Sequence, residues 1–197
     1  MKKGIIRLFF PLAGLLSLLA LSSCGPSLDS RNKMVVSVRD QKLLLLRDGK
    51  PVKSYKISTS KFGVGDTPNS NRTPLGRMKV AKKIGSGQPA GAVFKSRCPT
   101  GEVIKPNAPG RDPIVSRILW LTGTQSANRN AFRRYIYIHG TPEHNRLGSP
   151  ASYGCIRMGC KDVVDLYNRV GTGADVYVIR GSFNPTPAPQ RSYTAVR

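Results

Sequence analysis

Short apolar runs separated by turn residues recur from residue 34 onward, and several of them alternate between apolar and polar positions. Successive side chains of a β-strand point to opposite faces, so a period of two predicts strands. The predicted strands are 34–38, 42–46, 52–57, 77–84, 118–121, 135–138 and 174–179. An Asp48-Gly49 pair, typical of a tight hairpin turn, separates the second run from the third. The pattern predicts a mainly β fold with one or two short helices.

Residues 161–170 have a different period. Val163, Tyr167 and Val170 recur at helical spacing, and Gly171 follows where a glycine commonly ends a helix. The sequence therefore predicts one amphipathic helix. If its positive N-terminus points at Cys155, we expect it to lower the pKa of that thiol.

Two segments lack a regular pattern. Residues 63–72 form a Gly-, Asn- and Pro-bearing loop, which we interpret as an ordinary surface connection without chemistry. Residues 85–113 are dense in Gly and Pro, and a connection of this length is more often functional than idle. We expect the longer segment to act as a lid or binding loop beside Cys155.

The chain begins with a basic and then apolar stretch that is typical of an export signal. It ends in Leu21-Ser22-Ser23-Cys24, which resembles the lipobox of bacterial lipoproteins, so Cys24 is the predicted lipidation site. The division that follows is 1–23 signal peptide, 24–33 tether, 34–181 folded domain and 182–197 disordered Pro-rich tail. An uncleaved membrane helix is the alternative reading of the first segment.

The charge balance is strongly basic, with 32 Lys+Arg against 10 Asp+Glu and a formal net charge of +22. Loss of Lys2, Lys3 and Arg7 with the signal leaves +19. An exported protein of this charge meets anionic lipids and cell-wall polymers rather than nucleic acid. We therefore expect a membrane-anchored location in the cell envelope, the periplasm, and no nucleic-acid partner. The oligomeric state does not follow from the sequence.

The chemistry concentrates between residues 135 and 158. An apolar, aromatic run ends at His139-Gly140, and a polar loop then leads to Ser152-Tyr153-Gly154-Cys155. A strand thus presents a histidine and a loop presents a cysteine. Cysteine attacks acyl groups as its thiolate, so it needs a nearby base and N–H groups that hold the developing oxyanion. The chain has only two histidines, and the end of a strand holds an imidazole more firmly than a loop does.

These residues resemble the signature of the L,D-transpeptidase catalytic domain, often called the YkuD domain. The resemblance consists of His139-Gly140, the motif Ser-Tyr-Gly-Cys-Ile-Arg-Met at 152–158, and Thr-Pro-Leu-Gly at 73–76. Many members have His where Tyr153 stands. The resemblance implies a YkuD-like β-sandwich and a peptidoglycan stem peptide as substrate. It also implies that no cofactor or metal is needed.

The resemblance also implies roles for single residues. Cys155 would be the nucleophile, His139 the general base, and the carbonyl of Gly140 would orient the imidazole. The N–H groups around Tyr153, Gly154 and Cys155 would form the oxyanion hole. Two further residues complete the predicted site, namely Arg157 for a substrate carboxylate and Ser152 for the loop or the site. Few acidic residues are available to pair with Arg157 otherwise.

Several alternatives stay open at this stage. His139, His144, Cys155 and Cys160 are residue types that bind zinc, although their spacing matches no common zinc motif. The chain would then be a zinc-dependent wall hydrolase. A non-catalytic wall-binding lipoprotein is the other rival. Cys98 and Cys160 either form a disulfide or remain separate thiols. The acceptor is a second stem, water or a protein lysine.

Overall fold

The computed structural model describes residues 27–183. The predicted signal peptide, Cys24 and nearly all of the predicted tail lie outside the described residues. Within 27–183, no helix is both long and apolar enough to cross a membrane.

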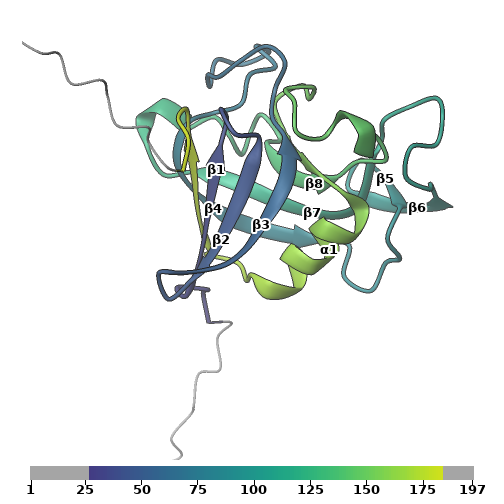
Figure 1. The fold of residues 1–197 in the computed structure, drawn as a ribbon, viewed down its shortest axis with the longest axis horizontal. Helices are drawn as coiled ribbons and strands as arrows, with labels where there is room; N and C mark the ends of the chain where they lie inside the picture. Colours follow the sequence, from purple (N-terminus) through teal and green to yellow (C-terminus); the bar gives the residue numbers. More distant parts are fainter. Residues whose placement is uncertain (1–26, 184–197) are drawn as a thin grey trace, which may run out of the picture.

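Ten strands, one α-helix and two 3₁₀ turns make up the described part of the chain (Figure 1). In chain order the elements are β1 (Asn32–Ser37), β2 (Lys42–Arg47), β3 (Lys50–Ser58), β4 (Gly76–Ile84), β5 (Ala92–Lys95), β6 (Cys98–Val103), β7 (Ile114–Gly123), η1 (Ser126–Asn128), β8 (Tyr137–Gly140), η2 (His144–Arg146), β9 (Ile156–Met158), α1 (Cys160–Arg169) and β10 (Asp175–Ile179).

The strands form one sheet in the order β4-β10-β1-β2-β3-β9-β8-β7-β5-β6, and β4 also pairs with β7. This last pairing closes eight strands into a barrel-like ring and leaves β5 and β6 as a projecting hairpin (Figure 1). Closure removes most of the exposed sheet edges. The prediction of a mainly β fold with a short helix is confirmed, and the two faces of the expected sandwich are continuous through β4 and β7.

Local turn chemistry accounts for the start of the fold. Asp48 and Gly49 both have positive φ, 51° and 78°, as a type I′ turn requires, and Arg47 pairs with Lys50 across it. The first strand begins at Asn32, two residues before the expected start. Asp29 accounts for this, because its Oδ1 accepts the Asn32 N–H at 3.0 Å and its Oδ2 accepts the Gly171 N–H at 2.7 Å.

The core fills the inside of this ring. Ile57, Leu119, Ile138 and Ile156 are fully buried there, and Leu166 of α1 adds to the same cluster. Helix α1 contacts β7 and β8, so it covers one end of the ring (Figure 1).

The predicted helix forms, with two differences at its ends. It starts at Cys160 rather than at 161, because His144 Nε2 accepts the Cys160 N–H at 3.0 Å. Val170 is the C-cap, and Gly171 does not take the left-handed conformation expected of a terminating glycine. Instead, Lys83 Nζ binds the helix-end carbonyls of Tyr167 and Val170 at 2.8 and 2.6 Å. A cation at the negative end of a helix stabilises it.

The irregular segment 85–113 contains two strands, β5 and β6, which its Gly- and Pro-rich sequence did not predict. β5 and β6 pair as a hairpin, and β5 joins the sheet through β7. The residues after β6 then return toward the end of β8, where the Asn107 N–H binds the carbonyl of Pro142 at 2.7 Å.

Candidate active site

The parallel pairing of β8 with β9 organises the site. Ile138 pairs with Ile156 and His139 with Arg157. Because neighbouring side chains in a strand point to opposite faces, the two isoleucines enter the core and His139 and Arg157 share the other face. Cys155 immediately precedes β9. Cys155 and His139 thereby line one cavity of about 160 Å³.

His139 is held in one tautomer. Its Nδ1 lies 2.8 Å from the carbonyl oxygen of Gly140, which only accepts hydrogen bonds, so Nδ1 carries the proton and Nε2 is left with the lone pair. Burial lowers the pKa of His139, against the opposing effect of that hydrogen bond. The imidazole is therefore neutral near pH 7 and able to take a proton. Gly140 is required here, because a Cβ would lie 2.5 Å from the Val115 carbonyl oxygen.

The Cys155 sulfur sits between two main-chain groups. Sγ accepts the Tyr137 N–H and faces the Tyr135 carbonyl, both at 3.4 Å. Burial raises the pKa of Cys155 to about 11, although the Tyr137 N–H and the charges of Arg134 and Arg157 oppose the shift. The expectation of a pKa lowered by α1 is therefore wrong, since burial dominates and the helix N-terminus binds His144.

This pKa predicts how alkylation of Cys155 depends on pH. A thiolate fraction governed by a pKa of about 11 rises about tenfold per pH unit up to that value, whereas an ordinary thiol levels off above about pH 9. Iodoacetamide labelling of the Cys155 peptide should therefore keep accelerating between pH 8 and pH 10. Mass spectrometry of digests measures it, and the peptide of exposed Cys98 in the same digest controls for the reagent. A plateau above pH 9 would contradict the prediction.

The loop before the nucleophile is tied internally. Ser152 Oγ donates to the Cys155 carbonyl at 2.6 Å and accepts the Gly154 N–H at 3.2 Å. Ser152 therefore holds the loop, and the Gly154 N–H is already engaged. Gly154 has a φ of 117°, which favours glycine. From the neighbouring segment, Thr73 Oγ1 accepts the Ser60 N–H and donates to the Gly154 carbonyl, each at 3.0 Å.

Replacing Thr73 with valine is expected to disturb this loop. The substitution keeps the shape but leaves a buried N–H and a buried carbonyl without their partner, which costs about 1–3 kcal/mol of unfolding free energy. The acylation rate of Cys155 should fall as well, because Gly154 loses its anchor. Urea unfolding and timed acylation measure the two effects. Thr67→Val, at an exposed position in the neighbouring loop 63–72, is the matched control, and equal effects of the two substitutions would refute the assignment.

Tyr153, which stands where many family members have His, points away from the core. Its side chain is exposed, and its hydroxyl accepts a hydrogen bond from Lys61 Nζ at 2.9 Å. This hydrogen bond lowers the pKa of Tyr153. The ring packs on Phe62 at 5.5 Å, so Tyr153 forms part of the cavity wall at the opening.

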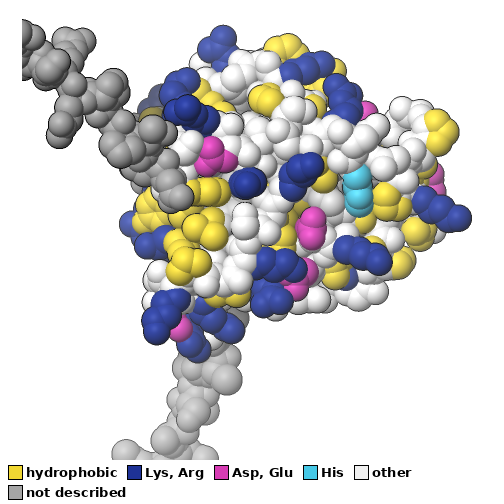
Figure 2. Space-filling model, in the orientation of Figure 1, with side chains coloured by type: hydrophobic (Ala, Val, Ile, Leu, Met, Phe, Trp, Pro, Cys, Tyr) yellow, Lys and Arg dark blue, Asp and Glu magenta, His cyan; other side chains and the backbone are white. Residues whose placement is uncertain are grey.

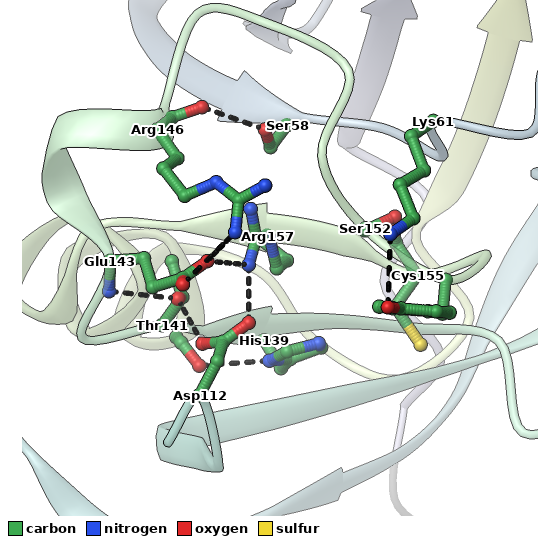
Figure 3. Close-up of polar contacts among 12 residues, drawn as sticks. Ser58, Lys61, Asp112, His139, Thr141, Glu143, Arg146, Ser152, Cys155 and Arg157 are labelled. Atoms are coloured by element: carbon green, nitrogen blue, oxygen red, sulfur yellow. Dashed lines mark hydrogen bonds and ion pairs between the residues drawn. The ribbon is translucent and has the colours of Figure 1, made fainter. Parts of the chain in front are cut away.

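Arg157 is buried and paired. Its Nη1 binds Asp112 Oδ2 and, at 2.7 Å, Glu143 Oε2, so that the guanidinium lies between two carboxylates (Figure 3). The expectation that acidic partners would be scarce is wrong. Nε and Nη2 have no hydrogen-bond partner within the described residues. Asp112 also accepts a hydrogen bond from Thr141 Oγ1, which pins the end of segment 85–113 beside the cavity.

Sequence reasoning missed Asp112 and Glu143, which lie 45 and 14 residues from Arg157. It also missed the loop 63–72. That loop supplies Pro68, Asn69 and Asn71 to a second cavity of about 520 Å³ that reaches Cys155. The interpretation of 63–72 as a plain surface connection is therefore wrong. No local pattern marks these residues, because their role depends on contacts with distant segments.

Arg134 holds this loop in place. Its Nη1 binds Asp66 Oδ1 and the Gly65 carbonyl, both at 3.0 Å, and its Nη2 binds the Arg72 carbonyl at 2.8 Å. Both charged side chains of the Arg134–Asp66 pair are buried, with 8% and 7% exposure.

The residues weighed as zinc ligands separate into different roles. His144 Nε2 is committed to the Cys160 N–H, and Cys160 is buried against the carbonyl of Thr141. Within residues 27–183, no group of three or more His, Cys, Asp or Glu side chains is placed to hold a metal ion. Cys98 is exposed while Cys160 is buried, and both are free thiols, so the considered disulfide does not form.

A barrel-like β domain with a cysteine and a histidine on one cavity, the histidine oriented by a main-chain carbonyl, is the architecture of a thiol-dependent acyl-transfer domain. The family model described as the L,D-transpeptidase catalytic domain, YkuD, matches residues 31–178. The chain belongs to this family of cysteine L,D-transpeptidases, which act on peptidoglycan stem peptides.

Solved structures agree at the level of the fold. L,D-transpeptidase 3 from Mycobacterium tuberculosis is 19% identical with a TM-score of 0.50, covering 76% of this chain and 61% of that one. The Ldtfm–avibactam carbamoyl enzyme is 18% identical with a TM-score of 0.50, covering 78% and 51%. This chain spans between half and two thirds of the length of such structures. No match was found among curated proteins.

Proposed function

We propose that this protein is a peptidoglycan L,D-transpeptidase that transfers the acyl group of a tetrapeptide stem through a thioester on Cys155. The observation that carries the proposal is the common cavity of Cys155 and His139, with His139 Nδ1 bound to the Gly140 carbonyl. This arrangement leaves Nε2 as a base facing the space where a substrate amide would lie. The two side chains make no direct hydrogen bond, a contact that commonly tightens when substrate binds.

The reaction proceeds in two steps. His139 takes the thiol proton as the sulfur attacks the carbonyl of the third stem residue, and it returns that proton to the departing amine of D-alanine as the C–N bond breaks. An amine of a second stem then attacks the thioester, loses its proton to His139 and releases the thiol. The raised pKa of Cys155 and the lowered pKa of His139 mean that the resting pair is neutral, so proton transfer accompanies the attack.

We assign the N–H groups of Tyr153 and Cys155 as the donors that would bind the oxyanion, because the Gly154 N–H already binds Ser152 Oγ. Arg157 lines the same cavity as His139. Its donors not used by Asp112 and Glu143 would receive the carboxylate of the stem. Water or a protein lysine in place of the stem amine would give a carboxypeptidase or an anchoring reaction, since the first half-reaction is shared.

The test is intact-mass spectrometry of the purified protein after mixing with a carbapenem, whose strained amide acylates a nucleophilic thiol. The expected result is one covalent adduct that maps to Cys155. Cys155→Ala should remove it, and Cys98→Ala should retain it, because Cys98 is a free thiol away from the cavity. No adduct on a folded protein would refute the thiol mechanism. Activity that resists alkylation and disappears with a chelator would favour the zinc hydrolase instead.

The lipid anchor is a separate part of the proposal. Its support is the lipobox-like sequence that ends in Cys24 and the basic, apolar stretch before it. Cys24→Ala should release the protein from membranes, as followed by fractionation. Continued membrane association would favour an uncleaved helix. A phenotype that survives Cys155→Ala would favour the non-catalytic wall-binding lipoprotein.

A further inference from the structure

Two cavities meet at the nucleophile. Cys155 and Tyr153 line both of them, the smaller of about 160 Å³ with His139 and the larger of about 520 Å³ without it. A stem peptide bound across Cys155 must therefore place one part in each cavity.

Proton transfer to and from His139 assigns the amine part and the acyl part of the stem to different cavities. The amine that leaves, and the amine that later attacks, must both exchange a proton with His139, so they must lie on the side of the imidazole. The leaving amine and the attacking amine are therefore expected in the smaller cavity. The acyl part of the donor, which includes the side chain of its third residue, remains for the larger cavity.

The larger cavity is basic and amide-rich. Its polar lining consists of Asn69, Asn71, Asn130, Arg133, Arg134 and the two tyrosines, and no Asp or Glu lines it. The charge of Arg134 is balanced by buried Asp66 at 3.0 Å. Arg133 is exposed, and within residues 27–183 no carboxylate pairs with it.

In the smaller cavity, acidic side chains neutralise the basic one. Asp112 and Arg157 line it as an ion pair, and Glu143 adds a second carboxylate to the same guanidinium. Among the described residues that line the two cavities, the cation without a carboxylate partner is thus Arg133, in the larger cavity. Figure 2 shows that Lys and Arg are spread over the visible face with few acidic side chains. Basic residues outside the cavity can therefore serve as controls for Arg133.

We propose that the larger cavity binds the side chain of the third stem residue, and that Arg133 selects a side chain that ends in a carboxylate over the bare amine of lysine. The inference rests on the proposed function and names its substrate class. A guanidinium attracts a carboxylate and repels an ammonium group, and a charge-assisted hydrogen bond accounts for about a tenfold preference.

The test compares three tetrapeptide donors in the thioester-forming step of the full chain. Their third residues end in a free carboxylate, in the corresponding carboxamide, or in the amine of lysine. The unchanged protein should acylate fastest with the carboxylate donor, by about tenfold over the carboxamide. Arg133→Gln should reduce this ratio to near one, and Arg133→Glu should favour the lysine donor.

Arg129→Gln and Arg129→Glu are the matched controls, because Arg129 is exposed on the same segment but does not line the cavity. They should leave all three rates in their original ratio. Carbapenem acylation without any donor preference, or equal effects at residues 129 and 133, would overturn the proposal and leave the thiol mechanism standing. Absence of the carbapenem adduct as well would overturn both.

Discussion

His139→Asn should lower the acylation rate of Cys155 at pH 7 by about 10²- to 10⁴-fold, the usual contribution of a general base. Asparagine can still donate to the Gly140 carbonyl that now binds Nδ1, so the local structure is kept while the base is lost. The loss should be largest near neutral pH, where the thiol with its pKa of about 11 is protonated. It should shrink toward pH 10, because more thiolate then forms without a base.

Timed mass spectrometry with a carbapenem at pH 7 and pH 10 measures both effects. The control is His144→Asn, since His144 caps α1 through the Cys160 N–H and is assigned no chemistry. That variant should keep the acylation rate while its unfolding free energy decreases. Equal rates for the unchanged protein and His139→Asn at pH 7 would rule out His139 as the base.

Asp66→Ala should lower the unfolding free energy by about 3–5 kcal/mol, because it leaves the buried guanidinium of Arg134 without its counter-charge. It also removes the acceptor of the Asn130 N–H, which Asp66 Oδ2 binds at 2.7 Å. The loop 63–72 should then detach from the segment that leads into β8. Since this loop walls the larger cavity, acylation by stem donors should slow more than acylation by a small carbapenem.

Urea unfolding monitored by circular dichroism measures the change in stability. Glu102→Ala is the matched control, because its ion pair with Arg111 lies on the surface with side chains 45% and 61% exposed. Exposed pairs contribute about 0–1 kcal/mol. Similar losses for the two variants would show that the Asp66 pair is no more than a surface contact.

The smaller cavity illustrates what a single sequence can and cannot predict. The resemblance named Cys155, His139, Gly140 and Arg157. The structure places Cys155, His139 and Arg157 around one cavity on the paired strands β8 and β9, and the Gly140 carbonyl binds His139. Asp112 carries no comparable signal. It lies in the irregular segment 85–113 and reaches Arg157 only because that segment folds back after the β5–β6 hairpin.

The electrostatic state of the thiol was also beyond prediction. Sequence position placed a helix directly after the cysteine and suggested a lowered pKa. In the folded chain, burial raises the pKa of Cys155, and the first N–H group of α1 is bound by His144. Desolvation depends on the whole packed environment, which no local pattern encodes.

By itself the sequence determined a set of local properties. These are most of the strands through their alternation, the Asp48-Gly49 turn through its residue types, the helix through its period, and the motif residues through their spacing. Only the tertiary structure decided the closure of the ring through β4 and β7, the ion pairs of Arg134 with Asp66 and of Arg157 with Asp112, and the presence of two cavities that meet at Cys155. The reason is physical. Propensities act between neighbours along the chain, whereas burial and charge pairing act between residues that meet only once the strands have found their partners.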